Sequence, residues 1–195
     1  MRLNRKFFNR STVIVAKELL GKYLCRRLNG KTIRSKITEV EAYCGPKDRA
    51  NHASKGVTPR TKIMFGPPGY AYIYMIYGMY YCLNFVTERE GYPAAVLIRG
   101  CELSSKYNVL SIKGKDRKDK STIHNTNPII QKLKGPGRLC REFKIDKKLN
   151  GTDISKSREL WVEDSRDRPK KIKKGKRIGI DYAGKWKDKL WRFYI

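Results

Sequence analysis

Residues 70–86, YAYIYMIYGMYYCLNFV, hold six tyrosines and no charged residue. Every second residue from Tyr70 to Tyr74 is a tyrosine, so a strand places these three rings on one face. The phase then slips, because Tyr77 comes three residues later and Gly78 follows it directly. A phase slip beside glycine is typical of a hairpin tip or a bulge. We therefore expect two largely buried strands joined by an exposed tip, with Tyr77 at its apex.

A second hairpin is expected nearer the N-terminus. Residues 23–28 and 31–42 flank Asn29-Gly30, and Asn-Gly supplies the two positive-φ positions of a tight type I′ turn. Before it, residues 12–21 carry apolar side chains at helical spacing, with Ser11 as N-cap. After it, residues 45–69 form a long loop rich in Pro and Gly, and a loop of this length between ordered elements is usually functional.

The remaining chain predicts a mixture of short elements. They are a turn at 88–93, a strand at 94–99, a charged loop at 113–120, helices at 127–133 and 138–143, and strands at 160–162, 177–180 and 190–194. Hairpins without repeated βαβ units favour the α+β class. We expect residues 1–195 to form a single compact domain, with a mixed, mostly antiparallel sheet, flanking helices and a protruding aromatic-tipped β-hairpin.

Charge indicates the class of partner. The 195 residues carry 45 Lys and Arg against 18 Asp and Glu, a formal net charge of +27. The first hundred residues hold +12 of this and the rest hold +15, so the whole body is basic. Such a balance favours a polyanion, most often nucleic acid. At 39 % hydrophobic residues, the composition is not that of a disordered chain.

Cysteine, histidine and hydropathy patterns exclude other classes. Five cysteines without a C-x-x-C pair argue against a disulfide scaffold or a zinc ribbon, and free thiols suit a reducing interior. His52 and His124, the only histidines, are far apart, so no metal centre is expected. The N-terminus lacks the apolar core of a signal peptide. Residues 66–86 are uncharged, but their Pro, Gly, Asn and Tyr content argues against a membrane span.

A candidate for acid–base chemistry lies at the end of the second hairpin. In ITEVEAY, residues 37–43, the strand period places Glu39, Glu41 and Tyr43 on one face. Desolvation between apolar and aromatic neighbours would raise a carboxyl pKa toward the range that is useful for proton transfer. A solvated strand carboxylate is the alternative, and the pattern does not decide between Glu39 and Glu41.

Two further features fit a nucleic-acid partner. An aromatic ring at the Tyr77 apex could enter between base steps as a wedge, with core packing as the alternative. The run RDRPKKIKKGKR, residues 166–177, has eight cations and one acid and predicts either a phosphate-contacting surface or a solvated loop. Walker A, G-x-S-x-G and zinc-deaminase motifs are absent, as is an acidic cluster for two magnesium ions, which disfavours those chemistries.

In order, the motifs resemble one known family. They are TEVEAY at 38–43, GP at 45–46 followed by His52, TPR at 58–60, MF at 64–65, YIYMIYGMY at 72–80, LN at 83–84, VLIR at 96–99, GPGRLC at 135–140 and RFY at 192–194. Together they resemble the alkyladenine (3-methyladenine) DNA glycosylase family over essentially the whole chain. The competing hypothesis is a non-enzymatic RNA- or ribosome-binding protein, which the charge would suit equally.

The resemblance implies a monofunctional DNA glycosylase that flips a damaged purine out of the duplex. Glu41 would be the general base that activates water, which selects it over Glu39. Arg99 would help to hold that water and the phosphate backbone. The implied substrates are 3-methyladenine and 7-methylguanine; the neutral base hypoxanthine needs more help to leave. The product would be an abasic site for base excision repair.

The resemblance also assigns the base pocket. Tyr43, His52 and Tyr74 would stack around the extruded base, and Tyr77 would fill the gap left in the duplex. Asn84 would select at the pocket wall against the amino group of normal guanine. No cofactor or metal is implied. We expect a monomer that binds damaged double-stranded DNA and no membrane, located with the nucleoid in a bacterium or in the nucleus of a eukaryote.

Overall fold

The structure, a computed structural model, describes residues 1–104, 130–165 and 168–195. It is built on one nine-stranded sheet, whose central strands follow the order β3-β4-β5-β2-β1-β7. β6 pairs with β5, and β9 joins β2 to β8. The strands are β1 (Tyr23–Leu28), β2 (Lys31–Tyr43), β3 (Ala71–Ile76), β4 (Tyr80–Val86), β5 (Ala95–Ser104), β6 (Ile130–Lys134), β7 (Leu160–Glu163), β8 (Lys173–Gly175) and β9 (Arg192–Tyr194). Every pairing among the described strands is antiparallel, where a mixed sheet was predicted.

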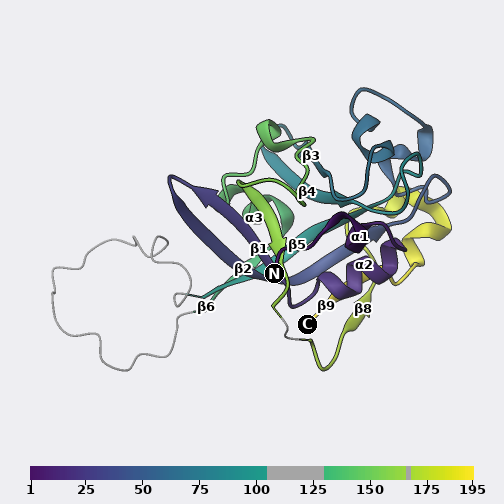
Figure 1. The fold of residues 1–195 in the computed structure, drawn as a ribbon. Coiled ribbons are helices and arrows are strands. Elements are labelled where there is room, and N and C mark those ends of the chain that lie inside the picture. Colours follow the sequence, from purple (N-terminus) through teal and green to yellow (C-terminus); the bar gives the residue numbers. More distant parts are fainter. Residues whose placement is uncertain (105–129, 166–167) are drawn as a thin grey trace, which may run out of the picture.

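In the described residues the helices are few and short, so the fold there is mostly β. The α-helices are α1 (Arg5–Phe8), α2 (Thr12–Leu19) and α3 (Pro136–Glu142). The 3₁₀ turns are η1 (His52–Lys55), η2 (Lys62–Phe65), η4 (Lys147–Leu149) and η5 (Asp181–Asp188). α2 packs on β2 and β5, whereas α3 packs on β4, β5 and β6 (Figure 1).

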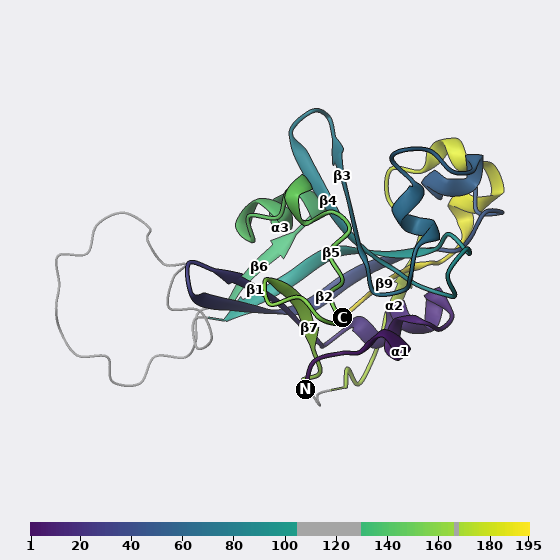
Figure 2. The same ribbon diagram turned by 45° about the horizontal axis from the view of Figure 1, so that its top comes forward.

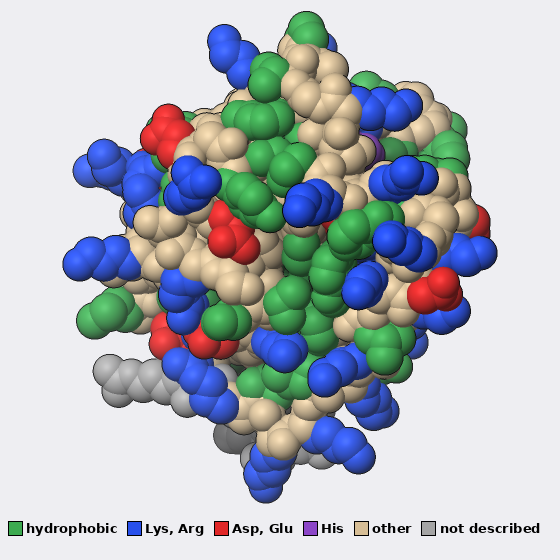
Figure 3. Space-filling view, turned by 90° about the vertical axis from the view of Figure 1, so that its right-hand side faces the viewer, with side chains coloured by type: hydrophobic (Ala, Val, Ile, Leu, Met, Phe, Trp, Pro, Cys, Tyr) green, Lys and Arg blue, Asp and Glu red, His purple; other side chains and the backbone are tan. Residues whose placement is uncertain are grey.

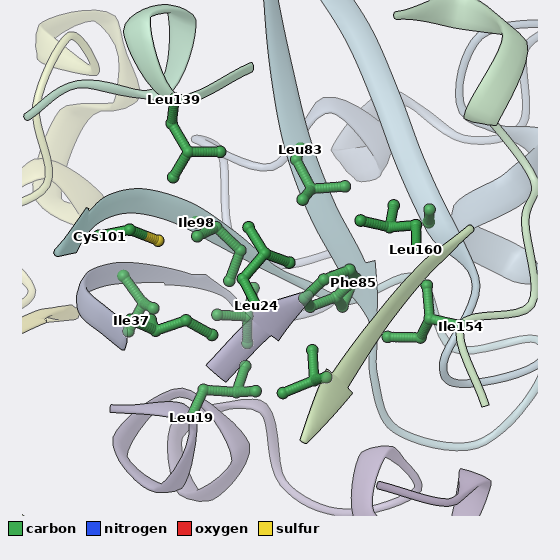
Figure 4. Packing of buried hydrophobic residues seen from close by; sticks show 14 of the residues in the cluster. Leu19, Leu24, Ile37, Leu83, Phe85, Ile98, Cys101, Leu139, Ile154 and Leu160 are labelled. Atoms are coloured by element: carbon green, nitrogen blue, oxygen red, sulfur yellow. The ribbon is translucent and has the colours of Figure 1, made fainter. Parts of the chain in front are cut away.

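The main core fills the space between the sheet and these helices. Figure 4 shows Leu19 of α2, Leu24 of β1 and Phe85 of β4 meeting at its centre, each with no exposed surface. Burying a side chain of this size contributes about 1.5–3 kcal/mol. A second, smaller cluster joins Met64 and other residues of the loop between β2 and β3 to Tyr72 of β3 and its neighbours.

Both predicted hairpins are confirmed. Asn29 and Gly30 have φ of 48° and 75°, and Leu28 pairs with Lys31 across them. In the other hairpin Ile76 pairs with Tyr80, which leaves Tyr77 in the three-residue tip with φ of 51°. Figure 2 shows this β3–β4 hairpin projecting from the sheet.

Several predicted elements are wrong because long-range pairing overrides local preference. Residues 130–134 form strand β6 on the open edge of β5, where a helix over 127–133 was predicted; residues 127–129 lie outside the described part, as does the charged loop 113–120. Residues 177–180 are not a strand, because the φ of 75° at Gly179 lies outside the extended region. The side chain of Arg177 is buried against Asp48. The strand lies earlier, at Lys173–Gly175.

Helix α2 begins where predicted but ends two residues earlier, and its cap differs from the prediction. It covers Thr12–Leu19, where 12–21 was predicted, and the Ser11 side chain makes no capping hydrogen bond. The amide of Thr12 instead donates to the carboxylate of Glu88 at 2.7 Å. A distant acidic side chain therefore supplies the cap that the local pattern assigned to a serine.

Candidate active site

A cavity of about 280 Å³ opens between the β3–β4 hairpin, the loop after β2 and the segment 178–182. In Figure 2 the hairpin rises on one side, and the loop and η5 lie together on the other. Six of the seven predicted site residues line it: Tyr43, His52, Tyr74, Tyr77, Asn84 and Arg99. A cavity of about 150 Å³ holds one benzene ring, so this one has room for a fused two-ring base.

The seventh residue, Glu41, lies one layer behind the cavity wall with no exposed surface. Three groups that line the cavity contact its carboxylate. The Tyr43 hydroxyl donates to Oε2 at 2.8 Å and the Ile178 amide donates to Oε1 at 2.9 Å. Arg99 Nε lies 3.5 Å from Oε1. A carboxylate has about four acceptor positions, so these contacts leave one for a further donor such as water.

The structure separates the two carboxylates that the sequence left open. Glu39 Oε1 is partly exposed and accepts from Arg99 Nε at 3.1 Å and Arg192 Nη1 at 3.2 Å. A β-bulge at Glu39 shifts the register between β2 and β5, so the two glutamates do not sit equivalently in the sheet. Burial raises the pKa of Glu41, and the charge of Arg99 is the largest effect that opposes this rise. Of the two, only Glu41 is fully desolvated.

Aromatic rings form the walls of the cavity. The His52 ring lies 4.6 Å from that of Tyr74 in an edge-to-face arrangement, and its Nδ1 hydrogen-bonds to the Tyr72 hydroxyl at 3.0 Å. Burial and the nearby charge of Arg60 lower the pKa of His52 to about 4, so the imidazole is neutral at physiological pH. The loop that carries His52 is fixed by Asn51, whose side chain donates to the Gly45 and Pro93 carbonyls.

Two lining residues differ sharply in exposure. Asn84 is buried, and its Nδ2 donates to the backbone carbonyls of Tyr72 at 3.0 Å and Cys82 at 3.4 Å, which orients the amide. Tyr77 lies at the mouth with 86 % of its surface exposed. Since this ring packs on almost nothing, its place at the hairpin tip is not explained by the core.

Sequence reasoning missed the wall that the C-terminal segment provides. Ile178, Gly179, Ile180 and Tyr182 all line the cavity, although residues 177–180 were predicted as a strand. Arg177, the last cation of the predicted phosphate-contacting run, is instead fully buried against Asp48. The amide of Ile178 contacts Glu41 from 137 positions away along the chain, and no local sequence pattern predicts that contact.

Comparison with known proteins agrees with this geometry. A family model described as methylpurine-DNA glycosylase (MPG) matches residues 6–195. The chain belongs to the methylpurine-DNA glycosylase family. It is therefore a DNA N-glycosylase, an enzyme that acts on damaged DNA, and the competing hypothesis of a non-enzymatic RNA-binding protein is wrong.

Relatives match this glycosylase over more than nine-tenths of their own lengths. A protein of Methanocella arvoryzae is 48 % identical over 193 residues, which cover 98 % of this chain and 91 % of the relative. Proteins of Desulfitobacterium hafniense and Alkaliphilus oremlandii are 43 % and 46 % identical, cover this chain completely, and are covered to 95 % and 96 %. Each of the three relatives carries the name 3-methyladenine DNA glycosylase, with the activity assigned by inference.

The face of the glycosylase around η5 combines apolar and cationic side chains. Figure 3 shows a band of hydrophobic side chains flanked by Lys and Arg. Ile178, Tyr182 and Leu190 are each at least half exposed, and a shallow hollow beside them is lined by Lys47, Arg49 and Lys185. Among the described residues, no helix has the length and apolar character needed to cross a bilayer.

Proposed function

We propose that this glycosylase hydrolyses the N-glycosidic bond of alkylated purines, 3-methyladenine and 7-methylguanine, by base flipping, and leaves an abasic site for base excision repair. It would act as a single-domain monomer on double-stranded DNA, in the compartment that holds the genome. The observation that carries the proposal is Glu41, a fully buried carboxylate held by three groups at the wall of an aromatic cavity.

Glu41 is proposed as the general base. Its free acceptor position takes a hydrogen bond from a water, which loses its proton to the carboxylate as its oxygen bonds to C1′. The N-glycosidic bond breaks at the same time, and the base leaves with the electron pair. Positive charge that develops on the deoxyribose is stabilised by the same carboxylate before the proton arrives. Arg99, in contact with Glu41, would hold the water and the adjoining phosphate.

The aromatic walls suit a cationic base. A purine alkylated at N3 or N7 carries a positive charge, and each favourable aromatic face contributes about 0.5–2 kcal/mol to its binding. Tyr43, His52 and Tyr74 would provide these faces. The low pKa of His52 matters here, because an imidazolium would repel such a base. A cationic purine also leaves as a neutral molecule, so it requires no general acid, whereas hypoxanthine would.

Selectivity and flipping are assigned to Asn84 and Tyr77. The oriented Asn84 amide at the wall would exclude the exocyclic amino group of guanine, so 7-methylguanine should be released more slowly than 3-methyladenine. Tyr77 would fill the gap left in the base stack. No lysine is among the described residues lining the cavity, which supports a monofunctional reaction without a Schiff base.

The test is to incubate the protein with duplexes that each contain one lesion and to detect the free base by chromatography. We expect release of 3-methyladenine and 7-methylguanine, in that order of rate, and a strand that breaks only after alkali treatment. Strand cleavage without alkali would contradict the monofunctional assignment. Failure to release either base would overturn the proposed substrates.

A further inference from the structure

An ion pair without solvent exposure lies directly behind the cavity. Arg177 and Asp48 both have fully buried side chains, and they meet through two parallel contacts, Nη1 to Oδ2 at 2.5 Å and Nη2 to Oδ1 at 2.9 Å. The Asp48 carboxylate also accepts from the amides of Cys44 and Ala50, each at 3.1 Å. Four donors therefore satisfy it, and its position is fixed.

The guanidinium of Arg177 connects three parts of the chain. It lies 4.8 Å from the centre of the Tyr43 ring and 5.1 Å from that of Trp191. Nη1 also donates to the carbonyl of Ala42 in β2 at 2.9 Å, and Nη2 donates to that of Trp186 in η5 at 3.2 Å. The end of β2, the loop after it and the C-terminal segment thus meet at one side chain.

The ion pair adjoins Glu41 through covalent neighbours. Ala42, which accepts from Arg177, lies between Glu41 and Tyr43 in the chain, and Ile178 follows Arg177. We infer that the Asp48–Arg177 pair is a positioning device for the proposed general base, which holds the Tyr43 hydroxyl and the Ile178 amide on the two oxygens of Glu41. This inference rests on the proposed function of Glu41.

Stability alone does not account for such a pair. Replacing a buried ion pair with well-packed neutral groups is often neutral or stabilising, because two charges must be desolvated. This pair also leaves the buried Arg177 Nε without a partner among the described residues. A structural role would be served by a simpler arrangement, whereas a rigid two-pronged contact suits a group that must be placed accurately.

The pair should also influence the ionisation of Glu41. The titratable or charged groups that face this carboxylate are Arg99 of β5, Tyr43 of β2, Cys82 of β4 and Arg177. Arg99, the Ile178 and Tyr43 hydrogen bonds and the Arg177 charge all favour the ionised form, against the effect of burial. Loss of the pair removes the Arg177 charge and weakens the hydrogen bonds from Ile178 and Tyr43, while the effect of Arg99 remains. The Glu41 pKa should therefore rise.

The experiment compares the double variant Asp48→Asn/Arg177→Gln with wild type. Both substitutions remove charge, so the variant avoids the unpaired buried charge that a single substitution would leave. Asparagine offers one acceptor oxygen in place of two, so one of the two backbone-amide contacts to residue 48 is lost. Single-turnover release of 7-methylguanine is measured against pH, because this base is already cationic and the acidic limb then reports the general base. Lys22→Met serves as a control, because it breaks a remote ion pair between a buried lysine and the partly exposed Asp164.

We expect the double variant to bind a lesion duplex within about three-fold of wild type and to lose about ten-fold or more in rate, since small misplacements of catalytic groups cost up to about a hundred-fold. The fall in its rate at acid pH should occur at higher pH than in wild type, whereas Lys22→Met should keep the wild-type dependence of rate on pH. A folded double variant whose rate and pH dependence both match those of wild type would overturn the inference.

A second readout separates this inference from the proposed function. Carbon-13 NMR titration of the Glu41 carboxyl follows its ionisation without any substrate. The carboxyl should titrate at higher pH in the double variant than in wild type, and an unchanged titration would contradict the positioning role. If wild type releases no base, the proposed function fails, yet this titration still decides whether the pair controls Glu41.

Discussion

Tyr77 offers the sharpest separation of function from stability. Its ring is 86 % exposed, so truncation to alanine removes almost no packing from the folded protein. Its backbone has φ of 51°, a left-handed conformation that costs a non-glycine residue about 1–2 kcal/mol. Tyr77→Gly should therefore stabilise the hairpin, while both substitutions remove the proposed wedge.

The magnitude follows from base stacking. An aromatic ring that stacks on a base contributes about 1–3 kcal/mol, which corresponds to a loss of about 5- to 150-fold in affinity for a duplex with a flipped lesion. Affinity for an undamaged duplex rests mainly on phosphate contacts and should change little. Tyr77→Phe retains the ring and should bind nearly as wild type.

Fluorescence anisotropy at fixed salt measures both affinities, with a duplex that carries an uncleavable abasic analogue opposite thymine and its undamaged counterpart. Thermal unfolding of each variant shows that the fold is kept. Wild-type affinity of folded Tyr77→Ala and Tyr77→Gly for the lesion duplex would refute the wedge, and an equal loss on both duplexes would mean that Tyr77 contacts DNA without entering the stack.

Three further predictions concern the cavity and its supports. Release of 7-methylguanine should fall at acid pH with a midpoint above the ordinary range of a glutamate, because burial raises the Glu41 pKa and this carboxylate must be ionised to accept a proton. With the His52 pKa at about 4, no second step should appear near pH 6.5, and a rate–pH profile checks both. Gly137→Ala would place Cβ 2.9 Å from Tyr80 Cβ, so we expect overpacking of about 1–3 kcal/mol, seen as a lower melting temperature and weaker lesion binding through the displaced hairpin. A chelator should leave the rate unchanged, since no three potential metal ligands cluster in residues 1–104, 130–165 and 168–195, and inhibition would indicate a bound metal.

Local chemistry is enough to predict the hairpins. Asn29-Gly30 specifies its turn through two positive φ angles, and the slip in tyrosine spacing predicts the apex at which Tyr77 lies. Each signal depends only on residues that are close together in the sequence. Contacts with distant parts of the chain therefore do not alter the predicted turn. The long loop after β2 is also predictable from its Pro and Gly content, and it carries His52 into the cavity.

Features that depend on distant partners are not predictable in this way. Residues 130–134 carry no strong strand pattern and become a strand because β5 offers an unpaired edge. Arg177 ends a basic run that predicts solvent exposure. Its side chain is buried instead, because it pairs with Asp48, which lies 129 positions earlier. Glu39 and Glu41 share a face in an ideal strand, and only the bulge and the opposing Ile178 amide distinguish them.

The most direct test of the general-base role is single-turnover base release by Glu41→Gln. Burial raises the Glu41 pKa, so the carboxyl's contribution to stability is fullest when it is protonated and declines as pH rises through that pKa. The neutral amide should therefore leave the melting temperature at pH 7 equal to or above that of wild type, and duplex binding should persist. We predict a loss of at least about 100-fold in the rate of base release. If folded Glu41→Gln protein releases base at the wild-type rate, Glu41 is not the general base.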